Sequence, residues 1–401
     1  MEEGSRVARV CIVRLSRFPG DPRVEREVGA LIDAGFRVDL VCLKRAGQKS
    51  IEPVAGALVY RLPASHRRAG RLRYMFEYAL SFIMAFVTVS ALHIVKRYQV
   101  VQVNTLPDFL AFVALVPKLL GARVLLDMHE VTPELYASKF RLPMESFQVK
   151  LMARVERLST GFADSVLCVS EPTREVLVQR GTPAKKIGVV MNLADSRLFH
   201  PLPPVLPIGR NHSSRFRLMC HGTIVERYGF QEAIQATALV GDQIPGLRLC
   251  ILGEGEYLPY LQQLASRLGV NDRIDFCGYV PLSEIPSRIS CCHAGLVPNL
   301  RDGFTDLVLP TKLMEYVAMG KPVIASRTRA IERYFDGSMV LFFEPGRAEE
   351  LAQRILDLYR REDMGVDLAR NAQRFLQTYR WEATKETYVG IVRHLANGDS
   401  K

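Results

Sequence analysis

Features of an exported protein are scarce in this sequence. Its eight cysteines stand singly except for Cys291-Cys292, without Cys-x-x-Cys or paired-ligand spacing. The cysteine pattern therefore predicts neither a disulfide framework nor a zinc site. Residues 1–9 are polar, and the apolar run at 10–13 has only the length of a strand. We expect no signal peptide and a reducing, cytoplasmic location.

Signatures of nucleic-acid and dinucleotide binding are also missing. Residues 1–200 contain 29 Lys and Arg against 19 Asp and Glu, so they carry +10 of the total net charge of +11. A basic half suits nucleic acid, an anionic membrane or a phosphorylated substrate. Aromatic residues do not alternate with the basic ones as a base-stacking surface requires, so we expect no nucleic-acid partner. No Gly-x-Gly-x-x-Gly fingerprint occurs.

One stretch, residues 79–95, is apolar and uncharged over 17 residues. This length lies at the lower limit for crossing a bilayer, so we expect a buried helix. Arg67, Arg68, Arg71 and Arg73 precede the stretch. The alternative is therefore peripheral contact with an anionic membrane, such as the inner face of the cell membrane.

Strand and helix patterns alternate through the first half of the chain. A β-rich run at 7–13 is followed by a glycine-bearing loop, a helical pattern at 23–34 and a strand at 38–42. Later strands are expected at 100–103, 123–127, 165–169 and 187–191, and a helix at 147–160. This order is typical of a doubly wound α/β domain, which binds ligands at the carboxyl ends of its strands.

The alternation restarts after a change in composition. Residues 200–214 hold four prolines and a run of polar residues, which is typical of a linker. Further strands are expected at 217–220, 247–252, 274–276, 294–298 and 323–325. We predict a first domain at 1–199, a linker at 200–215, a second domain at 216–380 and a helix at 381–401 that packs back toward the first domain.

Residues 309–326 read as loop, helix and strand. Thr311 is the expected N-cap, and Gly320 ends the helix. Lys312 lies in the first turn and Glu315 nearly on the same face. The free N–H groups of a helix start and an adjacent Lys suit a phosphate, and a carboxylate one turn later suits sugar hydroxyls. The alternative is an ordinary surface ion pair.

The first half offers two further candidates at strand ends. His129 and Glu130 follow the strand at 123–127, where substrate-facing groups of this fold class lie. A structural role for the histidine is the alternative. Gly20 lies in the first loop. Its role is either to allow a tight turn or to let the loop approach a bound substrate.

Seven motifs in chain order together resemble the retaining glycosyltransferases of the GT-B fold, and most closely their family four, which includes glycogen-synthase-like enzymes and bacterial polysaccharide and lipid-sugar transferases. The motifs are Phe18-Pro19-Gly20-Asp21-Pro22-Arg23-Val24, Asp127-Met128-His129-Glu130, the stretch from His221-Gly222 to Gly229, Leu252-Gly253-Glu254-Gly255, Gly278-Tyr279-Val280, Pro310-Thr311-Lys312-Leu313-Met314-Glu315-Tyr316 and Gly320-Lys321-Pro322-Val323-Ile324. The resemblance implies two Rossmann-like domains that face each other across a cleft.

It also implies roles for single residues. The second domain is expected to bind a nucleoside-diphosphate sugar, and the first to bind a carbohydrate, lipid-linked or small hydroxyl acceptor. His129, Lys312 and Arg227 are the expected catalytic residues. Donor contacts are expected from Gly20, Gly222, Gly278, Tyr279, Val280, Leu309, Pro310 and Glu315. The resemblance implies neither a metal nor a cofactor, and no Asp-x-Asp lies in a suitable loop.

The sequence departs from the family pattern at two places. The family shows Glu-x7-Glu, but Leu307 stands where its first Glu belongs, and the nearby Asp302 and Asp306 are the candidate sugar-facing acids. Thr223 and Tyr228 replace the basic residues of the phosphate loop. Arg227 and Lys312 are therefore the candidates for neutralising the phosphates.

The predicted function is transfer of a hexose-type sugar from a nucleotide donor to a hydroxyl acceptor with retention of configuration, in polysaccharide, glycolipid or glycoconjugate synthesis. A nucleotide-sugar epimerase of the same fold is the enzymatic alternative. A partner subunit that binds the donor without catalysis is the other, because the first Glu is missing.

Overall fold

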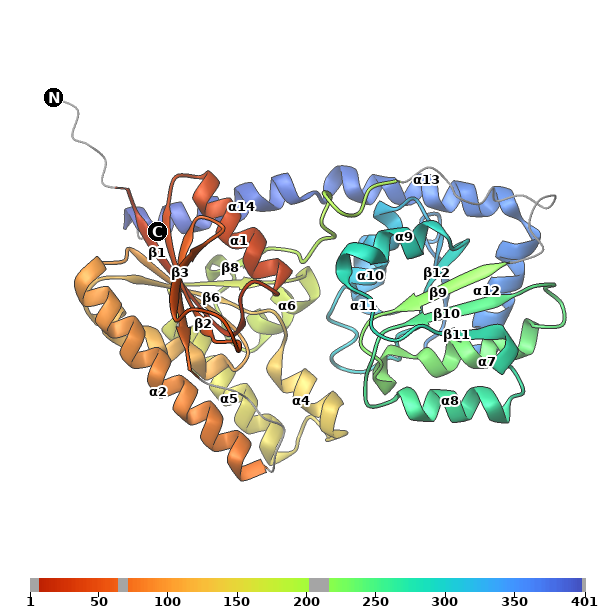
Figure 1. Cartoon of the computed structure of the whole chain (residues 1–401), viewed down its shortest axis with the longest axis horizontal. Coiled ribbons are helices and arrows are strands. Elements are labelled where there is room, and N and C mark those ends of the chain that lie inside the picture. The colour runs from red at the N-terminus through yellow and green to blue at the C-terminus, as the bar shows by residue number, and fades with distance from the viewer. Residues whose placement is uncertain (1–6, 64–70, 202–215, 399–401) are drawn as a thin grey trace. The chain divides into compact units, whose positions relative to one another are not determined.

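The computed structural model describes residues 7–63, 71–201 and 216–398, which form two compact units (Figure 1). One unit combines Met1–Met191 with Glu382–Lys401, and the other is Asn192–Trp381. Nearly all of the predicted linker lies outside the described residues, as do Arg67 and Arg68.

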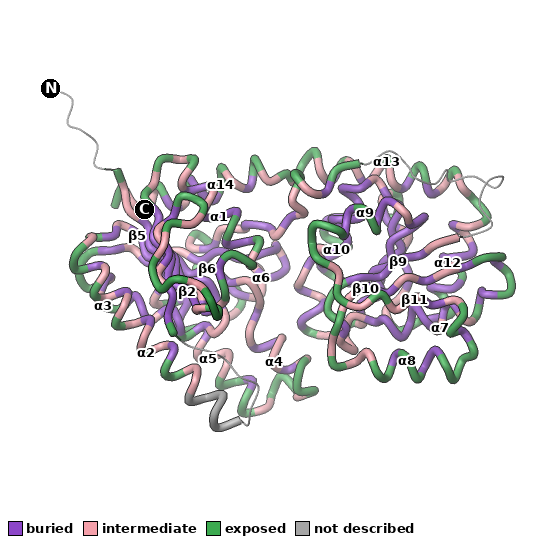
Figure 2. Tube along the Cα trace, in the orientation of Figure 1, coloured by how far each residue is buried: buried purple, intermediate pink, exposed green. Residues whose placement is uncertain are grey.

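The first unit is built on an eight-stranded sheet of order β3-β4-β2-β1-β5-β6-β7-β8, parallel except for the antiparallel pair β3 and β4. Its strands are β1 (Arg9–Arg17), β2 (Arg37–Leu43), β3 (Ile51–Val54), β4 (Ala57–Leu62), β5 (Val100–Asn104), β6 (Arg123–Asp127), β7 (Ser165–Cys168) and β8 (Ile187–Val189). The parallel strands are buried along most of their length (Figure 2). The strand order reverses between β1 and β5, the point where ligands bind in such sheets.

Helices cover this sheet. They are α1 (Pro22–Asp33), α2 (Arg71–Lys96), α3 (Leu115–Leu119), α4 (Thr132–Phe140), α5 (Phe147–Phe162), α6 (Glu171–Gln179) and α14 (Trp381–Asn397), with short 3-10 turns η1 (Asp108–Ala114) and η2 (Ala184–Lys186). The Asp21 side chain accepts a bond from Val24 N–H and Pro22 opens α1, which fixes its start. Tyr388 of α14 is buried, and its hydroxyl donates to Gln102 Oε1 at 2.6 Å.

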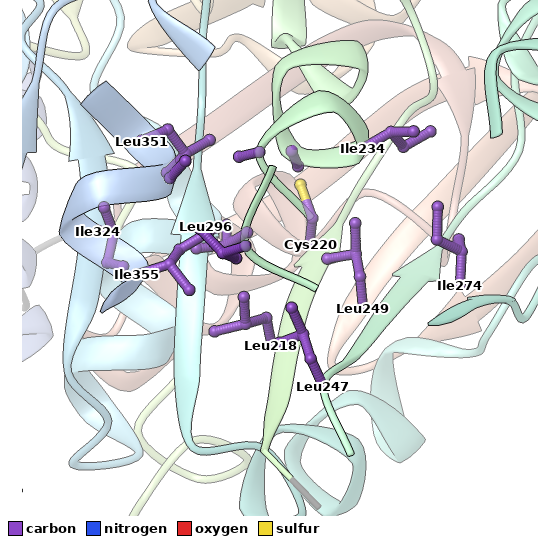
Figure 3. Close-up of a cluster of buried hydrophobic side chains, with 14 of the residues drawn as sticks. Leu218, Cys220, Ile234, Leu247, Leu249, Ile274, Leu296, Ile324, Leu351 and Ile355 are labelled. Carbon is purple, nitrogen blue, oxygen red and sulfur yellow. The ribbon is translucent and has the colours of Figure 1, made fainter. Parts of the chain in front are cut away.

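The second unit is a six-stranded parallel sheet of order β11-β10-β9-β12-β13-β14. Its strands are β9 (Arg217–His221), β10 (Arg248–Leu252), β11 (Ile274–Phe276), β12 (Ala294–Val297), β13 (Val323–Ser326) and β14 (Leu341–Phe343). This is the doubly wound order, whose reversal falls between β9 and β12. Leu218, Leu249 and Leu296 of three neighbouring strands point into one apolar core (Figure 3).

The helices of the second unit are α7 (Phe230–Val240), α8 (Leu258–Arg267), α9 (Ile285–Ser290), α10 (Thr311–Ala318), α11 (Arg329–Tyr334), α12 (Ala348–Arg360) and α13 (Glu362–Thr378), with 3-10 turns η3 (Glu226–Tyr228), η4 (Asn271–Arg273) and η5 (Leu282–Glu284). The predicted N-cap of α10 is wrong by one residue. Pro310 holds the cap position, without a side-chain cap bond, and Thr311 is the first helical residue.

The elements of the structure differ from the expected ones in four places. The hairpin of β3 and β4 and the short strand β14 were not predicted, and β1 continues through residues 14–17, which were expected in a loop. The helix predicted at 79–95 exists within α2, but it is not buried all round, because Ile83 and Val87 are exposed. An apolar composition therefore predicted the helix but not which of its faces meets solvent.

Candidate functional site

The carboxyl ends of β9 and β12 carry the candidate site of the second unit. His221 is the last residue of β9, and α10 begins in the connection between β12 and β13. Side chains from β9, from the loop that follows it and from α10 meet here. Because this edge is where the strand order reverses, it is the expected ligand position of a doubly wound sheet.

Two residues of α10 hold His221. Its Nε2 lies 2.6 Å from Glu315 Oε2, and its Nδ1 lies 2.7 Å from the Tyr316 hydroxyl. The Tyr316 hydroxyl donates its own hydrogen to the backbone oxygen of Met219 at 2.9 Å. The hydrogen bond between this hydroxyl and Nδ1 therefore requires a ring that carries a hydrogen on Nδ1. Sequence reasoning used His221 only as part of a motif and missed its bond to Glu315. The signal available in the sequence was that His221 is a polar residue at the end of a buried strand.

Lys312 lies inside the unit rather than on its surface. Its Nζ is buried and has no hydrogen-bond partner in the part of the chain that the structure describes. The ammonium lies 5.1 Å from the ring centroid of Tyr228 and 5.2 Å from that of Phe230. Burial lowers the pKa of Lys312. The alternative of a surface ion pair with Glu315 is wrong, because that carboxylate is bonded to His221 and both side chains are buried.

Arg227 joins Lys312 at the same tyrosine ring. Its guanidinium lies 5.2 Å from the centroid of Tyr228 and 5.6 Å from that of Phe304. The Arg227 carbonyl accepts from Leu300 N–H at 2.9 Å, which ties the loop to the segment after β12. Gly229 has φ +66°, and an added Cβ would lie 1.7 Å from the Pro298 carbonyl oxygen. The structure thus brings two predicted basic residues together.

Three glycine-bearing loops follow β9, β10 and β11. Gly253 N–H donates to the Gly278 carbonyl at 2.7 Å, and Gly222 N–H donates to the Leu252 carbonyl at 3.0 Å. At Gly253 an added Cβ would lie 1.9 Å from the Gly222 oxygen. The close approach therefore requires glycine here. Beside this backbone edge, Val280 is half-buried and Tyr279 is exposed.

The two candidate acids lie in the loop before α10 and both accept backbone hydrogen bonds. Asp302 Oδ1 accepts from the backbone N–H of Thr305 at 2.7 Å, and Asp306 Oδ1 accepts from that of Arg329 at 3.1 Å. Leu307, which directly follows Asp306, is buried. Asp302 therefore stabilises a turn of this loop, and Asp306 holds the loop to the start of α11. Leu309 and Pro310 are buried and lead directly into the first turn of α10.

His129 belongs to a buried polar network at the carboxyl ends of β5 and β6 in the first unit. Its Nε2 lies 2.9 Å from Asp127 Oδ2 and 3.1 Å from Asn104 Nδ2. The Asn104 amide donates to Asp127 and to Glu27, at 2.8 and 2.9 Å. Its hydrogens are then used, so we assign the His129 Nε2 hydrogen to Asp127. Burial lowers the pKa of His129, which favours the neutral ring, although Asp127 acts in the opposite direction.

Arg23 of α1 balances this network. Its guanidinium donates to both oxygens of Asp127, at 3.0 and 2.5 Å. Although burial acts in the opposite direction, Arg23 and then His129 hold the pKa of Asp127 below its ordinary value. Burial, followed by the nearby Asp127 carboxylate, raises the pKa of Glu27. The sequence did not reveal the roles of Arg23, Glu27 and Asn104, because α1 and β5 lie far from Asp127 and His129 along the chain.

Among the described residues, Glu27, Asp127 and His129 offer ligand atoms within 4.8 Å of one another. A metal ion does not fit this group well. The Arg23 guanidinium already neutralises Asp127, and the His129 nitrogen that faces the carboxylates carries the hydrogen assigned above. The group is therefore best understood as a hydrogen-bonded support for His129.

Gly20 begins the turn into α1. Its φ of +134° favours glycine, and its N–H donates to Glu25 Oε1 at 2.7 Å. The turn follows β1 and lies in the first unit with His129. For this loop the sequence left two roles open, a structural turn and an approach to a bound substrate.

Comparisons with known proteins match both units. Residues 20–192 match a family described as "Glycosyl transferase 4-like domain", and residues 215–361 match one described as "Glycosyl transferases group 1". A similar relative is the GDP-mannose-dependent alpha-(1-6)-phosphatidylinositol monomannoside mannosyltransferase of Mycolicibacterium smegmatis. It is 29% identical over 181 residues, which are 44% of this chain and 47% of that protein. The chain spans 47% to 65% of the length of the first curated relatives that it matches.

Solved structures share the fold over nearly the whole chain. Sucrose-phosphate synthase of Thermosynechococcus elongatus superposes with a TM-score of 0.77 at 19% identity, over 98% of this chain and 100% of that one. HepE of Anabaena, solved in complex with UDP-glucose, gives 0.73 at 17% identity, over 96% and 99%. At these identities the likeness concerns the fold.

Proposed function

Because the chain belongs to the GT-B glycosyltransferases of family four, we propose that it transfers a sugar from a nucleoside-diphosphate sugar to a hydroxyl acceptor with retention of configuration. The second unit binds the donor and the first binds the acceptor. The GDP-mannose dependence of one relative and the UDP-glucose complex of one structural neighbour support a nucleotide-sugar donor.

The buried ammonium of Lys312 is the observation that carries this proposal. An unpaired charge inside a protein is costly, so it persists where it has a use. Lys312 lies in the first turn of an eight-residue helix whose N-cap has no side-chain bond. Its flexible stem allows Nζ to turn from the rings of Tyr228 and Phe230 to an anion at that helix start.

The proposed chemistry follows from the charge that transfer creates. Breaking the bond between the anomeric carbon and phosphate leaves negative charge on the diphosphate. Lys312, Arg227 and the N–H groups at the start of α10 stabilise that charge. Glu315, oriented by His221, accepts hydrogen bonds from the ribose hydroxyls.

The neutral imidazole of His129 serves the sugar side of the reaction. Asp127 accepts from Nε2–H, so Nδ1 keeps a lone pair for a hydrogen bond. This arrangement supports a role for His129 against the transferred sugar, and the family resemblance supports an approach of the Gly20 loop to the donor phosphate. The proposed steps use neither a metal ion nor a cofactor.

The acceptor is a carbohydrate or lipid-linked hydroxyl in polysaccharide or glycolipid synthesis, on the cytoplasmic side of the membrane. The relative that acts on a phosphatidylinositol monomannoside supports a lipid-linked acceptor. The basic first half of the chain suits a phosphorylated or lipid-bound substrate.

The test is an assay of donor consumption and transfer with a panel of UDP-, GDP- and ADP-sugars and lipid-linked acceptors. We expect turnover of at least one donor and an α-linked product from an α-linked donor. Acceptor-independent change of the donor sugar would instead identify an epimerase, and a product of inverted configuration would contradict retention.

A donor-binding subunit without catalysis is the second candidate. Leu307 is buried where the family carries a glutamate, and Asp302 and Asp306 both accept backbone hydrogen bonds that hold their own loop. Calorimetry, read together with the transfer assay, separates the two functions. Tight binding of a nucleotide sugar without transfer to any acceptor favours the non-catalytic subunit, whereas turnover by the isolated chain excludes it.

A further inference from the structure

The first unit presents an exposed apolar stripe along α2. Leu80, Ile83, Val87 and Ile94 follow helical spacing and are between 43% and 59% exposed. The opposite side of the helix, marked by Ala85 and Val89, is buried in the core. Among the described residues, Glu77–Lys96 is the helix segment apolar and long enough to cross a membrane by length and composition. Because one side packs on the sheet, the helix suits lying along a surface instead.

Neighbouring helices extend this stripe. The turn η1 packs against α2, where the rings of Phe82 and Phe109 lie 5.7 Å apart, and against α5, where those of Phe112 and Phe162 lie 5.1 Å apart. The helices thus form one layer over the sheet (Figures 1 and 2). The layer exposes Leu119 of α3 and Phe147, Leu151 and Leu158 of α5. We call the exposed apolar side chains of α2, α3 and α5 the apolar face.

Basic residues accompany the apolar face on α5. Lys150, Arg154 and Arg157 are exposed beside Leu151 and Leu158 at helical spacing. Glu156, the acidic residue of α5, is buried. Between Tyr78 and Val95, α2 contains no charged residue. The layer therefore combines large apolar side chains with the exposed basic residues of α5.

We propose that the apolar face docks on the surface of an anionic lipid bilayer. Apolar side chains on a helix lying in the interface enter the boundary between headgroups and acyl chains, while Lys and Arg beside them contact anionic headgroups. Charge complementarity decides between occupants. A second copy of this chain would bring Lys150, Arg154 and Arg157 against like charges, whereas anionic lipid neutralises them. The docked face keeps the enzyme at the place where a lipid-linked acceptor would be found, but the binding requires no donor or acceptor.

The test is flotation of the full chain with vesicles of phosphatidylcholine alone or mixed with phosphatidylglycerol. We expect binding to the mixed vesicles only. Lys150→Ala/Arg154→Ala/Arg157→Ala should lower the partition coefficient roughly 100-fold, since each basic residue near an anionic surface contributes about 1 kcal/mol. High salt should weaken binding of the wild type.

A second variant tests the apolar side chains. Ile83→Glu/Val87→Glu should lower binding about 10-fold or more, because it removes apolar burial and adds charge repulsion. The matched control is Leu239→Glu/Leu268→Glu, at exposed leucines of the second unit. It should bind as the wild type does, and thermal unfolding should report that both variants remain folded.

Several results would overturn the proposal. Equal binding to both kinds of vesicle would exclude anionic lipid, and no binding to either would exclude a membrane. Unchanged binding of both first-unit variants would exclude the apolar face. Self-association that Ile83→Glu/Val87→Glu abolishes, without vesicle binding, would assign the face to a second copy of the chain.

Discussion

Glu315 Oε2 and His221 Nε2 lie 2.6 Å apart, although 94 residues separate them in sequence. The contact joins the end of β9 to the first turns of α10. Since the Tyr316 hydroxyl contacts the other ring nitrogen, the imidazole is held from both sides. One residue of the strand thereby fixes the direction of the carboxylate proposed to bind ribose.

Replacing His221 should therefore weaken nucleotide binding. In His221→Ala the Glu315 carboxylate loses a hydrogen bond, and bonds to charged groups contribute about 1.5 to 3 kcal/mol. We expect the Kd for the preferred nucleoside diphosphate to rise about 10-fold or more, measured by calorimetry.

A second buried histidine provides the control. His293 precedes β12, at the opposite end of the strand from the site, and its Nδ1 accepts from Arg217 N–H at 3.0 Å. His293→Ala should destabilise the unit without changing the Kd. An equal loss of affinity in both variants would contradict the proposed role of His221.

Lys312→Met should separate stability from activity. Removing the buried ammonium relieves an unpaired charge, so the free energy of unfolding should rise by about 1 kcal/mol or more. The activation barrier to transfer should rise by about 2 to 4 kcal/mol if the ammonium stabilises the leaving diphosphate. Urea unfolding and single-turnover assays measure the two effects.

Lys321→Met is the matched control for that variant. Lys321 is also buried, but its Nζ donates to the carbonyls of Ser290 and Cys292, at 2.9 and 2.8 Å. Its loss leaves two buried acceptors unpaired, so stability should fall. An unchanged transfer rate in Lys312→Met would rule out Lys312 as a phosphate ligand.

His129→Gln should impair turnover more than nucleotide binding. The glutamine amide can still donate to Asp127, which keeps the ion pair with Arg23 intact. We expect kcat to fall about 100-fold, the scale of losing one oriented group at a reacting centre, with the Kd for the nucleotide unchanged. Equal losses in kcat and in affinity would return His129 to a structural role.

Stability should fall as pH rises toward 7. Burial raises the pKa of Asp108 to about 7 and that of Glu156 to about 7, although Arg180 acts in the opposite direction on both. The folded chain keeps these protons up to about pH 7, whereas the unfolded chain releases them near pH 4. The free energy of unfolding therefore decreases between these values and levels off above.

Asp108→Asn tests this pH dependence, because it removes one of the two carboxyl groups. It should flatten the pH dependence and stabilise the chain by about 1 to 3 kcal/mol at pH 8, measured by urea unfolding at pH 6 and 8. The exposed Asp272→Asn should leave the profile unchanged. A wild-type profile without a slope would contradict the raised pKa values.

The alternation of strands and helices could be predicted because local periodicity reports it. Val100 and its neighbours form a run buried on both sides of a parallel sheet, and the helix of residues 311–318 follows from apolar spacing between Pro310 and Gly320. Short elements escaped because few residues carry their pattern. The strand Leu341–Phe343 is one example.

The candidate site was predicted in part for the same reason. Lys312 and Glu315 share one helix turn, so their proximity to each other was local information. The bond between Glu315 and His221 could not be predicted from local sequence. The same holds for the position of the Lys312 ammonium near two rings from η3 and α7.

The sequence by itself determined which segments form two doubly wound sheets, the family to which the chain belongs and the helix that begins the proposed donor site. The tertiary structure decided which charges are paired, that His129 is held by Asp127 and which side of α2 meets solvent. The physical reason is the range of the forces involved. Periodicity and capping act within a few turns, whereas burial and charge pairing depend on neighbours that only the folded chain brings together.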